Sequence, residues 1–377
     1  MLKIDHCGDK GARESFARLL NNGDQTYSAL IGELQRARRC IHLEYYIFDD
    51  DRIGRAIAEV LIRRARGGVK VRLIYDLFGS WLPARGMLRR LRRAGVEVHH
   101  FRPLKWNGLW QGINIRNHRK IAIIDLEMAF LGGINIARRY LEGSELGRWR
   151  DEHLQLQGGA VRELERLFRE DWLMVGGKSY PSIESVGPTY PRIPPVRGLR
   201  IISSREGESR RQIEESLLRL IRSARHELCA STPYLIPPRS LRTALRYAVK
   251  RGVKVRLMIP SRVESRLVGW VAESFYEELL RDGVELYRYE NGFLHSKMML
   301  CDRSRTYLGT ANLDYRSLRI NWEVGALIEG GHFGRHIART FEQDLLHCHP
   351  LRLHDHQKRP LLHRLLGGLV RPLAPLL

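Results

Sequence analysis

The residues best suited to chemistry stand in two copies of one short pattern. That pattern is H-x-K-x4-D, and the two copies supply His118, Lys120, Asp125, His295, Lys297 and Asp302. In each copy the histidine and the lysine open an apolar run, which predicts a short buried strand. Residues two apart on a strand point to the same face, so each imidazole is expected beside an ammonium group. Two complete copies therefore predict one catalytic site built from both.

The sequence around the two copies matches as well. His295 follows His118 by 177 positions, and Asn312 follows Asn135 by the same interval. Upstream, GVKVRLIYD (68–76) parallels GVKVRLMIP (252–260). These matches indicate an internal duplication of about half the chain, a period far longer than that of a solenoid repeat. We therefore expect two homologous domains that face each other, with both motifs at one cleft.

Residues of these types can carry out displacement at phosphorus. Two lysines and two asparagines can hold a phosphoryl group by charge-assisted hydrogen bonds. One histidine can attack phosphorus, and the other can protonate the leaving alkoxide and then activate an alcohol or water. Asp151 and Glu323 are the candidate carboxylates that set the protonation of the two rings. This chemistry needs no metal or other cofactor, and the sequence offers no cysteine–histidine cluster or dense carboxylate set.

The motifs identify the chain as similar to the phospholipase D superfamily, whose site is built from two H-x-K-x4-D motifs. Within it, the segments LEYYIF, STPYLIPP and GTANLDYRSLRINWE resemble bacterial cardiolipin synthases of the short form. The resemblance implies an α/β fold of two phospholipase D-like α/β/α sandwich domains related by pseudo-twofold symmetry. It also implies His118 as nucleophile and His295 as general acid. The predicted substrate-binding residues are Asn135, Asn312, Asp151, Glu323, Glu44 and Tyr234.

The resemblance also implies a reaction. A phosphatidyl group would pass from one phosphatidylglycerol to the glycerol hydroxyl of another, through a phosphohistidine, giving cardiolipin and glycerol. Longer synthases carry two N-terminal membrane helices that we do not find in this sequence, so the phosphatidyl donor and acceptor stay open. Alternatives are a phospholipase D that makes phosphatidic acid, a nuclease, and a lipid- or nucleic-acid-binding module without activity. Two intact motifs argue against the last of these.

Composition limits the partners of the protein. The chain has 377 residues, a net charge of +22 and a pI of about 10.2, so it should seek polyanions. An anionic membrane containing phosphatidylglycerol or cardiolipin is the expected partner, and no nucleic acid is expected. No apolar run reaches the roughly 18–20 residues of a spanning helix, and no signal peptide is evident. Five scattered cysteines favour a reducing compartment. The expected location is peripheral, on the cytoplasmic face of the cell membrane, while the oligomeric state stays open.

Alternating helical and strand patterns predict an α/β layer fold. Residues 15–40 are predicted to form one helix. The loop 102–117 and the basic, Leu-rich segment 357–377 are predicted to contact the membrane. The expected parts are a first domain, a Pro-rich linker, a second domain and a membrane-directed tail, at residues 1–175, 176–198, 199–350 and 351–377.

Overall fold

The computed structural model describes residues 15–80, 84–101, 114–181, 192–205, 209–359, 367 and 369–374. The first half contains β1 (Ser15–Asn21), α1 (Asn22–Arg36), β2 (Cys40–Tyr45), α2 (Arg52–Arg66), β3 (Lys70–Asp76), α3 (Leu77–Ser80), α4 (Arg85–Arg93), β4 (Glu97–Phe101), β5 (Lys120–Ile124), β6 (Met128–Gly132), α6 (Arg139–Glu142), β7 (Trp149–Arg150), β8 (Glu152–Gly158) and α7 (Gly159–Met174).

The second half repeats this order and adds a C-terminal extension. It contains β9 (Pro195–Ser204), α8 (Gln212–Ser223), β10 (Glu227–Ser231), β11 (Leu235–Ile236), α9 (Arg239–Lys250), β12 (Lys254–Pro260), α10 (Arg266–Arg281), β13 (Glu285–Tyr289), β14 (Phe293–Leu294), β15 (Met298–Cys301), β16 (Arg305–Gly309), β17 (Leu313–Asp314), α11 (Tyr315–Arg319), β18 (Glu323–Glu329), α12 (Gly331–Leu345), β19 (Cys348–Leu351), α13 (Leu353–Gln357) and η1 (Arg371–Leu373).

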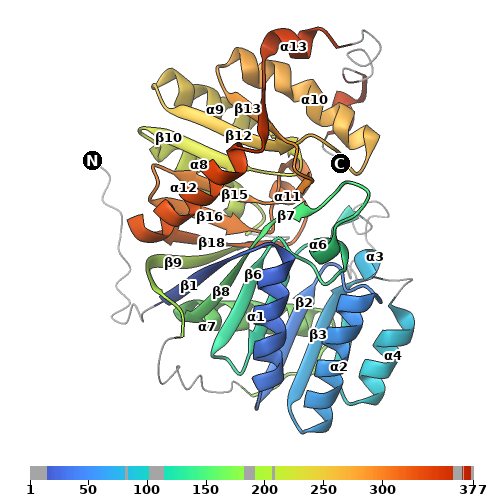
Figure 1. Ribbon diagram of the computed structural model, residues 1–377. Coiled ribbons are helices and arrows are strands. Elements are labelled where there is room, and N and C mark those ends of the chain that lie inside the picture. Colours follow the sequence, from blue (N-terminus) through green and yellow to red (C-terminus); the bar gives the residue numbers. More distant parts are fainter. Residues whose placement is uncertain are drawn as a thin grey trace.

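One mixed sheet runs through both halves, which lie one above the other in Figure 1. Its strand order is β19-β13-β12-β10-β15-β16-β18-β9-β1-β8-β6-β5-β2-β3-β4. Read outward from the β9–β1 junction, the two series are equivalent strand for strand, with β19 as an additional edge. Among the described residues, the junction is formed by the pairs Ser15–Val196 and Phe16–Pro195. This order confirms the predicted pseudo-twofold duplication.

Helices cover both faces of the sheet. α1, α2 and α4 pack on the first half, and α8, α9 and α10 pack on the same face of the second half. On the opposite face, α7 and α12 contribute to a single core that includes Leu164, Phe168, Ile337 and Phe341. Because this core takes side chains from both halves, apolar burial holds the halves together and makes the position of each motif depend on the other.

Local sequence explains the individual elements, as α2 illustrates. Ile53, Ile57 and Leu61 recur every four residues and are buried. Asp51 caps the helix, its carboxylate accepting from the N–H groups of Ile53 and Gly54 at 3.0 Å. Such a cap satisfies donors that the first turn cannot satisfy itself.

Two predicted boundaries are corrected. Residues 15–40 do not form one helix, because β1 precedes α1 and pairs with β8 along its whole length. Ladder hydrogen bonds to a strand distant in sequence thus outweigh local periodicity. Pro195 lies within the predicted linker but opens β9, a position where proline is tolerated because it need not donate to the ladder.

The structure describes part of the C-terminal segment that is predicted to contact a membrane. Arg359 forms an ion pair with Glu273, and Arg371 forms one with Glu278, both on α10. The Arg371 guanidinium also lies 4.4 Å from the ring of Phe275. These arginines dock the described part of the segment on the second half, while the prediction that it contacts a membrane stays a prediction. Residues 360–366, 368 and 375–377, and 102–113 of the predicted membrane-contacting loop, lie outside the described residues.

Candidate active site

Each motif is held in place by the opposite half. Asn117 forms a parallel bridge with Trp322, and β14, just before His295, pairs with β7. The backbone N–H of His118 donates to the carbonyl of Trp322 at 2.9 Å, and the N–H of His295 donates to the carbonyl of Arg150 at 2.8 Å. The backbone of each motif therefore takes its position from the other copy of the duplication.

Both histidines line one pocket of about 320 Å³ between the halves. The other predicted site residues on its wall are Asn135, Asn312 and Tyr234. This arrangement confirms the prediction that the two motifs meet at one cleft.

The two lysines lie beneath the histidines, buried from solvent. The Nζ of Lys120 donates to the carbonyl of His118 at 2.6 Å. The Nζ of Lys297 lies 2.8 Å from Nδ1 of His295 and 4.0 Å from the carboxylate of Asp151. Each ammonium group is thus held against its own motif histidine, and the two are close enough for the charge of Lys297 to act on Lys120. An anion bound beside the histidines would be stabilised by both.

Each imidazole is paired with a carboxylate from the opposite half. Nδ1 of His118 lies 3.0 Å from both carboxylate oxygens of Glu323. Nδ1 of His295 lies 2.6 Å from Oδ2 of Asp151. A carboxylate at Nδ1 fixes the ring and leaves Nε2 for chemistry. Asp151 and Glu323, predicted among the substrate-binding residues, are therefore placed on the histidines, as their suggested role in setting protonation requires.

Burial and neighbouring charge set the protonation of the first histidine and its partners. Burial lowers the pKa of His118, although the charge of Glu323 opposes the shift. Burial also lowers the pKa of Lys120 to about 7. Burial alone would raise the pKa of Glu323, but His118, Lys120 and the Thr310 hydroxyl bring it below its usual value. A neutral imidazole next to an anionic carboxylate is the form that a nucleophile needs.

The second histidine is shifted further in the same direction. Burial and the charges of Lys297 and Lys120 hold the pKa of His295 well below its usual value. Burial raises the pKa of Asp151, against the charge of Lys297. An anion bound between the lysines would offset their charge and raise the pKa of His295 again.

The two asparagines occupy equivalent places but differ in their contacts. Asn135 uses its amide within the wall, accepting from the N–H of Ile47 at 3.0 Å and donating to the Tyr140 hydroxyl at 2.6 Å. The Oδ1 of Asn312 is buried, with no hydrogen-bond partner among the described residues. Tyr234 lies on the wall next to Glu264, whose carboxylate accepts from its hydroxyl.

The motif aspartates do not join the pocket, contrary to the prediction that they are catalytic. Asp125 accepts from the N–H groups of Arg38, Arg39 and Cys40 at 2.7–2.9 Å. Asp302 accepts from the three N–H groups of residues 225–227 at 2.9–3.1 Å. Each thus fastens the turn after its motif strand to the start of the neighbouring strand, β2 or β10. Both have positive φ, which aspartate tolerates better than most residues.

Replacing Asp302 with alanine should therefore lower stability and leave the chemistry unchanged. Losing the acceptor removes three hydrogen bonds to a charged group that fix this turn, and because the donors are only partly shielded from water we expect a cost of about 1–3 kcal/mol. The checks are the urea midpoint and the turnover per folded molecule, with the exposed Asp355→Ala as control. If the variant keeps its stability but loses turnover, Asp302 has a catalytic role after all.

Glu44 also lies away from the pocket, which corrects its assignment to substrate binding. It is fully buried and accepts from the amide of Asn117 at 2.7 Å. Arg119, between the motif histidine and lysine, is 4.0 Å from Glu44 and forms an ion pair with Asp171. Sequence reasoning missed this buried cluster, although Asp171 recurs in the second half of the sequence as Asp344, 173 positions later. In the second half Asp344 pairs with Arg150, so the equivalent acid binds across the junction.

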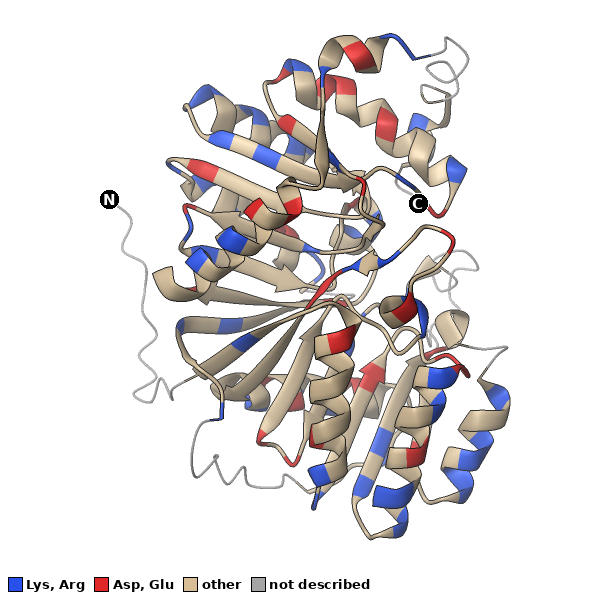
Figure 2. Ribbon diagram, viewed as in Figure 1, with Lys and Arg blue, Asp and Glu red and all other residues tan. Residues whose placement is uncertain are grey.

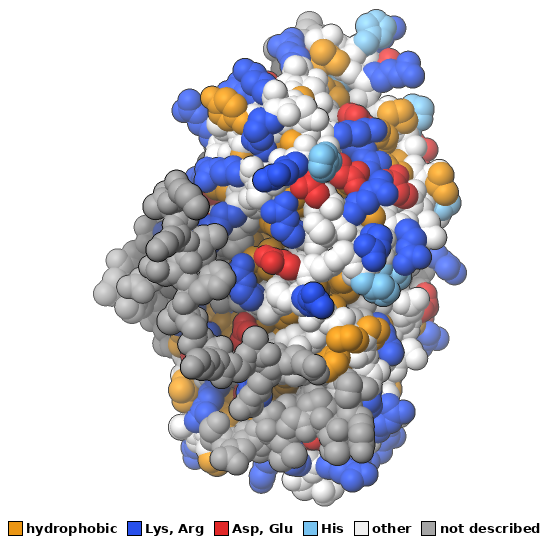
Figure 3. Space-filling model, turned by 90° about the vertical axis from the view of Figure 1, so that its left-hand side faces the viewer, with side chains coloured by type: hydrophobic (Ala, Val, Ile, Leu, Met, Phe, Trp, Pro, Cys, Tyr) orange, Lys and Arg blue, Asp and Glu red, His pale blue; other side chains and the backbone are white. Residues whose placement is uncertain are grey.

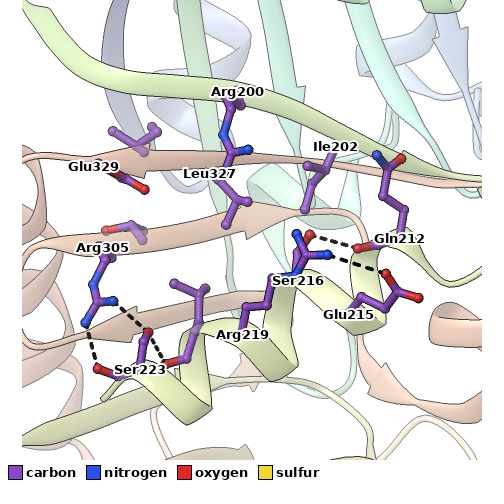
Figure 4. Close-up of a pocket in the computed structure, with 13 residues that line it drawn as sticks. Arg200, Ile202, Gln212, Glu215, Ser216, Arg219, Ser223, Arg305, Leu327 and Glu329 are labelled. Carbon is purple, nitrogen blue, oxygen red and sulfur yellow. Dashed lines mark hydrogen bonds and ion pairs between the residues drawn. The ribbon is translucent and has the colours of Figure 1, made fainter. Parts of the chain in front are cut away.

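A larger cavity, of about 370 Å³, lies away from the histidines, between α8 and strands β9, β16 and β18. Its wall carries Arg200, Arg219 and Arg305, with Arg305 bonded to Ser223 and Arg219 directed at Glu215 (Figure 4). It contains none of the residues of the two motifs, so we do not assign the reaction to it.

Comparison with known proteins decides the family. A family model described as "Cardiolipin synthase, PLD-like domain" matches residues 30–172 and 217–345. The chain belongs to the cardiolipin synthase family of phospholipase D-like proteins. A cardiolipin synthase from Geobacillus sp. (strain WCH70) is 37% identical over 96% of this chain and 72% of its own length. Cardiolipin synthase 2 from Bacillus anthracis is 37% identical over 97% of this chain and 71% of its own length.

Solved structures agree on the fold. The phosphatidylserine synthase of Haemophilus influenzae Rd KW20 aligns with a TM-score of 0.69 at 15% identity, over 96% of this chain and 95% of that one. The polyphosphate kinase of Porphyromonas gingivalis aligns with a TM-score of 0.61 at 15% identity, over 94% of this chain and 53% of that one. Membership of the cardiolipin synthase family is thus consistent with a phospholipase D-like fold. None of the helices described here is long and apolar enough to cross a bilayer.

Proposed function

We propose that this chain is a cardiolipin synthase that transfers a phosphatidyl group from one phosphatidylglycerol to another. The observation that carries the proposal is the pair of histidines in one pocket, each oriented by a carboxylate of the opposite half. The family supports the substrate, and the pocket supports the reaction type. The two halves act as two domains, the first ending near residue 175 and the second beginning with β9 at Pro195.

In the first step Nε2 of His118 attacks phosphorus, and the bond to the leaving glycerol oxygen breaks. Lys120, Lys297, the amide of Asn312 and the remaining amide N–H of Asn135 hold the non-bridging oxygens, whose negative charge raises the pKa of His295 and supplies the protonated acid. His295 gives its proton to the glycerol oxygen. The product is a phosphatidyl group on His118, with its charge still held by the lysines.

In the second step the hydroxyl of another phosphatidylglycerol attacks the same phosphorus. Its proton passes to Nε2 of His295, and the electron pair of the phosphorus–nitrogen bond returns to His118. Cardiolipin leaves, and both rings regain their starting protonation. No residue outside this pocket takes part in the proton balance.

The protein would act as a peripheral protein on the cytoplasmic face of the cell membrane. Net charge supports this, as does α4, which carries five arginines and no acid along one exposed side (Figure 2). Each basic side chain near an anionic bilayer contributes about 1 kcal/mol of attraction. On the face in Figure 3, which is the side away from α4, basic side chains are spread over the described surface rather than gathered in one groove.

The test is incubation of the purified chain with phosphatidylglycerol vesicles and separation of the lipid products. We expect cardiolipin and free glycerol with the wild-type chain, and neither with His118→Ala. Phosphatidic acid without cardiolipin would make the protein a phospholipase D. Unchanged lipid, with cleavage of added DNA, would make it a nuclease.

A further inference from the structure

The two motif histidines and their carboxylates are related by the pseudo-twofold symmetry of the halves. The residues that line the rest of the pocket are not. Beside His295 stand Arg139, Tyr140, Tyr234 and Glu264, which we name the Glu264 wall. The rings of Tyr140 and His295 are 5.5 Å apart.

The opposite flank, beside His118, is built differently. The rings of Tyr46 and His118 are 5.0 Å apart there, and Arg116 and Arg316 line the pocket on this side. Both arginines are close enough to act on the charge state of Tyr46, and Arg316 acts on Arg116. Among the described lining residues, the flank beside His118 carries two arginines and no acid, although Asp76 and Glu323 lie close enough behind it to act on Tyr46, whereas the other flank exposes Glu264 to the pocket.

Glu264 is unusual among the acids of the pocket. Only Glu264 and Asp314 are acids among the described lining residues, and Asp314 is occupied in capping α11 through the N–H of Ser317 at 2.6 Å. Glu264 is exposed, accepts from the Tyr234 hydroxyl, and is close enough for its charge to act on Arg139 and Lys297. A carboxylate near the phosphate position repels the anionic substrate, so its presence calls for a ligand that donates hydrogen bonds.

The equivalent place in the first half holds no such acid. Lys70 and Lys254 open equivalent strands, and ten residues after them stand Ser80 and Glu264. Ser80 is buried and satisfied by backbone, accepting from the N–H of Phe48 at 2.9 Å and donating to the carbonyl of Tyr46 at 3.1 Å. The acid is therefore a feature of one flank only, and it distinguishes the two sides of an otherwise duplicated site.

We propose that the Glu264 wall is a polyol subsite, in which Glu264 and Tyr234 bind the hydroxyls of the glycerol headgroup and select that alcohol over water. This inference rests on the proposed function and on the roles of the two histidines. In a displacement in line with His118, the leaving and the entering alcohol both lie on the side of His295, and that side is the Glu264 wall. Glycerol carries hydroxyl donors that ethanol and water cannot present in the same geometry, and a carboxylate accepts them.

The test measures the choice between two alcohols. Phosphatidylglycerol vesicles are given isotope-labelled glycerol and ethanol together, and mass spectrometry measures labelled phosphatidylglycerol, phosphatidylethanol and phosphatidic acid. We expect Glu264→Gln to lower the ratio of labelled phosphatidylglycerol to phosphatidylethanol by about tenfold, the effect of one hydrogen bond to a charged group. Ethanol transfer should keep its wild-type rate, and cardiolipin should fall relative to phosphatidic acid.

Two further variants sharpen the result. Tyr234→Phe leaves the carboxylate but removes its hydrogen-bond donor, so a smaller fall in the same ratio is expected. Glu215→Gln, an acid on the wall of the separate cavity in Figure 4, should leave the ratio unchanged. An unchanged ratio in Glu264→Gln, or an equal loss with both alcohols, would overturn the subsite. A wild-type chain that forms none of the three products would instead overturn the proposed function, and the subsite with it.

Discussion

The His295→Asn variant should transfer phosphatidyl groups from phosphatidylglycerol about 10²- to 10⁴-fold more slowly than the wild type, the range for a lost general acid. From a phosphatidyl ester of p-nitrophenol, formation of the intermediate should be slowed far less. Glycerol leaves as a strong base that needs a proton, whereas p-nitrophenolate leaves without one. The measurement is the initial burst of p-nitrophenolate beside the steady production of cardiolipin.

His118→Ala is the matched comparison, because it lies in the same pocket and removes the attacking atom. It should abolish both reactions, since no leaving group compensates for a missing nucleophile. Acid quenching of the His295→Asn reaction should trap phosphate on His118, identified by peptide mass. Trapping on His295 in the wild type, or a burst that survives in His118→Ala, would reverse the two roles.

Glu323→Gln should reduce transfer on the order of 10²- to 10⁴-fold and move the acid limb of the pH–rate profile to lower pH. Glu323 holds the His118 ring by Nδ1, and its negative charge raises the pKa of that ring. Without the charge the pKa of His118 falls further, so the neutral nucleophile persists to lower pH although the maximal rate is reduced. The measurement is kcat/KM between about pH 4 and 9.

Asp151→Asn provides the control for this shift. It removes the carboxylate from His295 by an equally isosteric change, so it should lower the rate while leaving the acid limb of His118 in place. If the rate of Glu323→Gln falls but the acid limb of its pH–rate profile does not move, Glu323 orients the His118 ring without setting its pKa.

The sequence was sufficient for the duplication and for the centre of the site. Two motifs with equal spacing predicted that His118 and His295 meet, and the structure brings them to one pocket with Lys120 and Lys297 beneath. The short apolar runs that follow the motif lysines predicted the strands β5 and β15, which the structure confirms. Glu323 was found as a carboxylate near the rings, but its pairing across the halves follows from how the halves dock.

What the sequence did not predict depends on contacts between distant segments. Asp125 is an acid within the motif and so could take part in catalysis. Its carboxylate instead accepts hydrogen bonds from backbone N–H groups 85–87 residues earlier in the chain. Aligning STPYLIPP with LEYYIF predicts that Tyr234 matches Tyr45 or Tyr46. The pairing of Leu235 with Leu313 and of Phe48 with Ile136 instead makes Tyr234 the counterpart of Ile47 in the duplication. Such a one-residue shift is set by ladder register, which side-chain patterns of two short strands do not fix.

The exchange of carboxylates between the halves has a consequence for the energetics of the enzyme. Glu323 belongs to the half that lacks His118, and Asp151 belongs to the half that lacks His295. Any opening of the junction removes the partner of both rings at once, so nucleophile and acid are switched off in the same motion. A partly opened molecule therefore lacks a correctly paired nucleophile as well as a correctly paired acid, and it should not release phosphatidic acid. The fraction of active enzyme then equals the fraction of molecules in which the junction is closed.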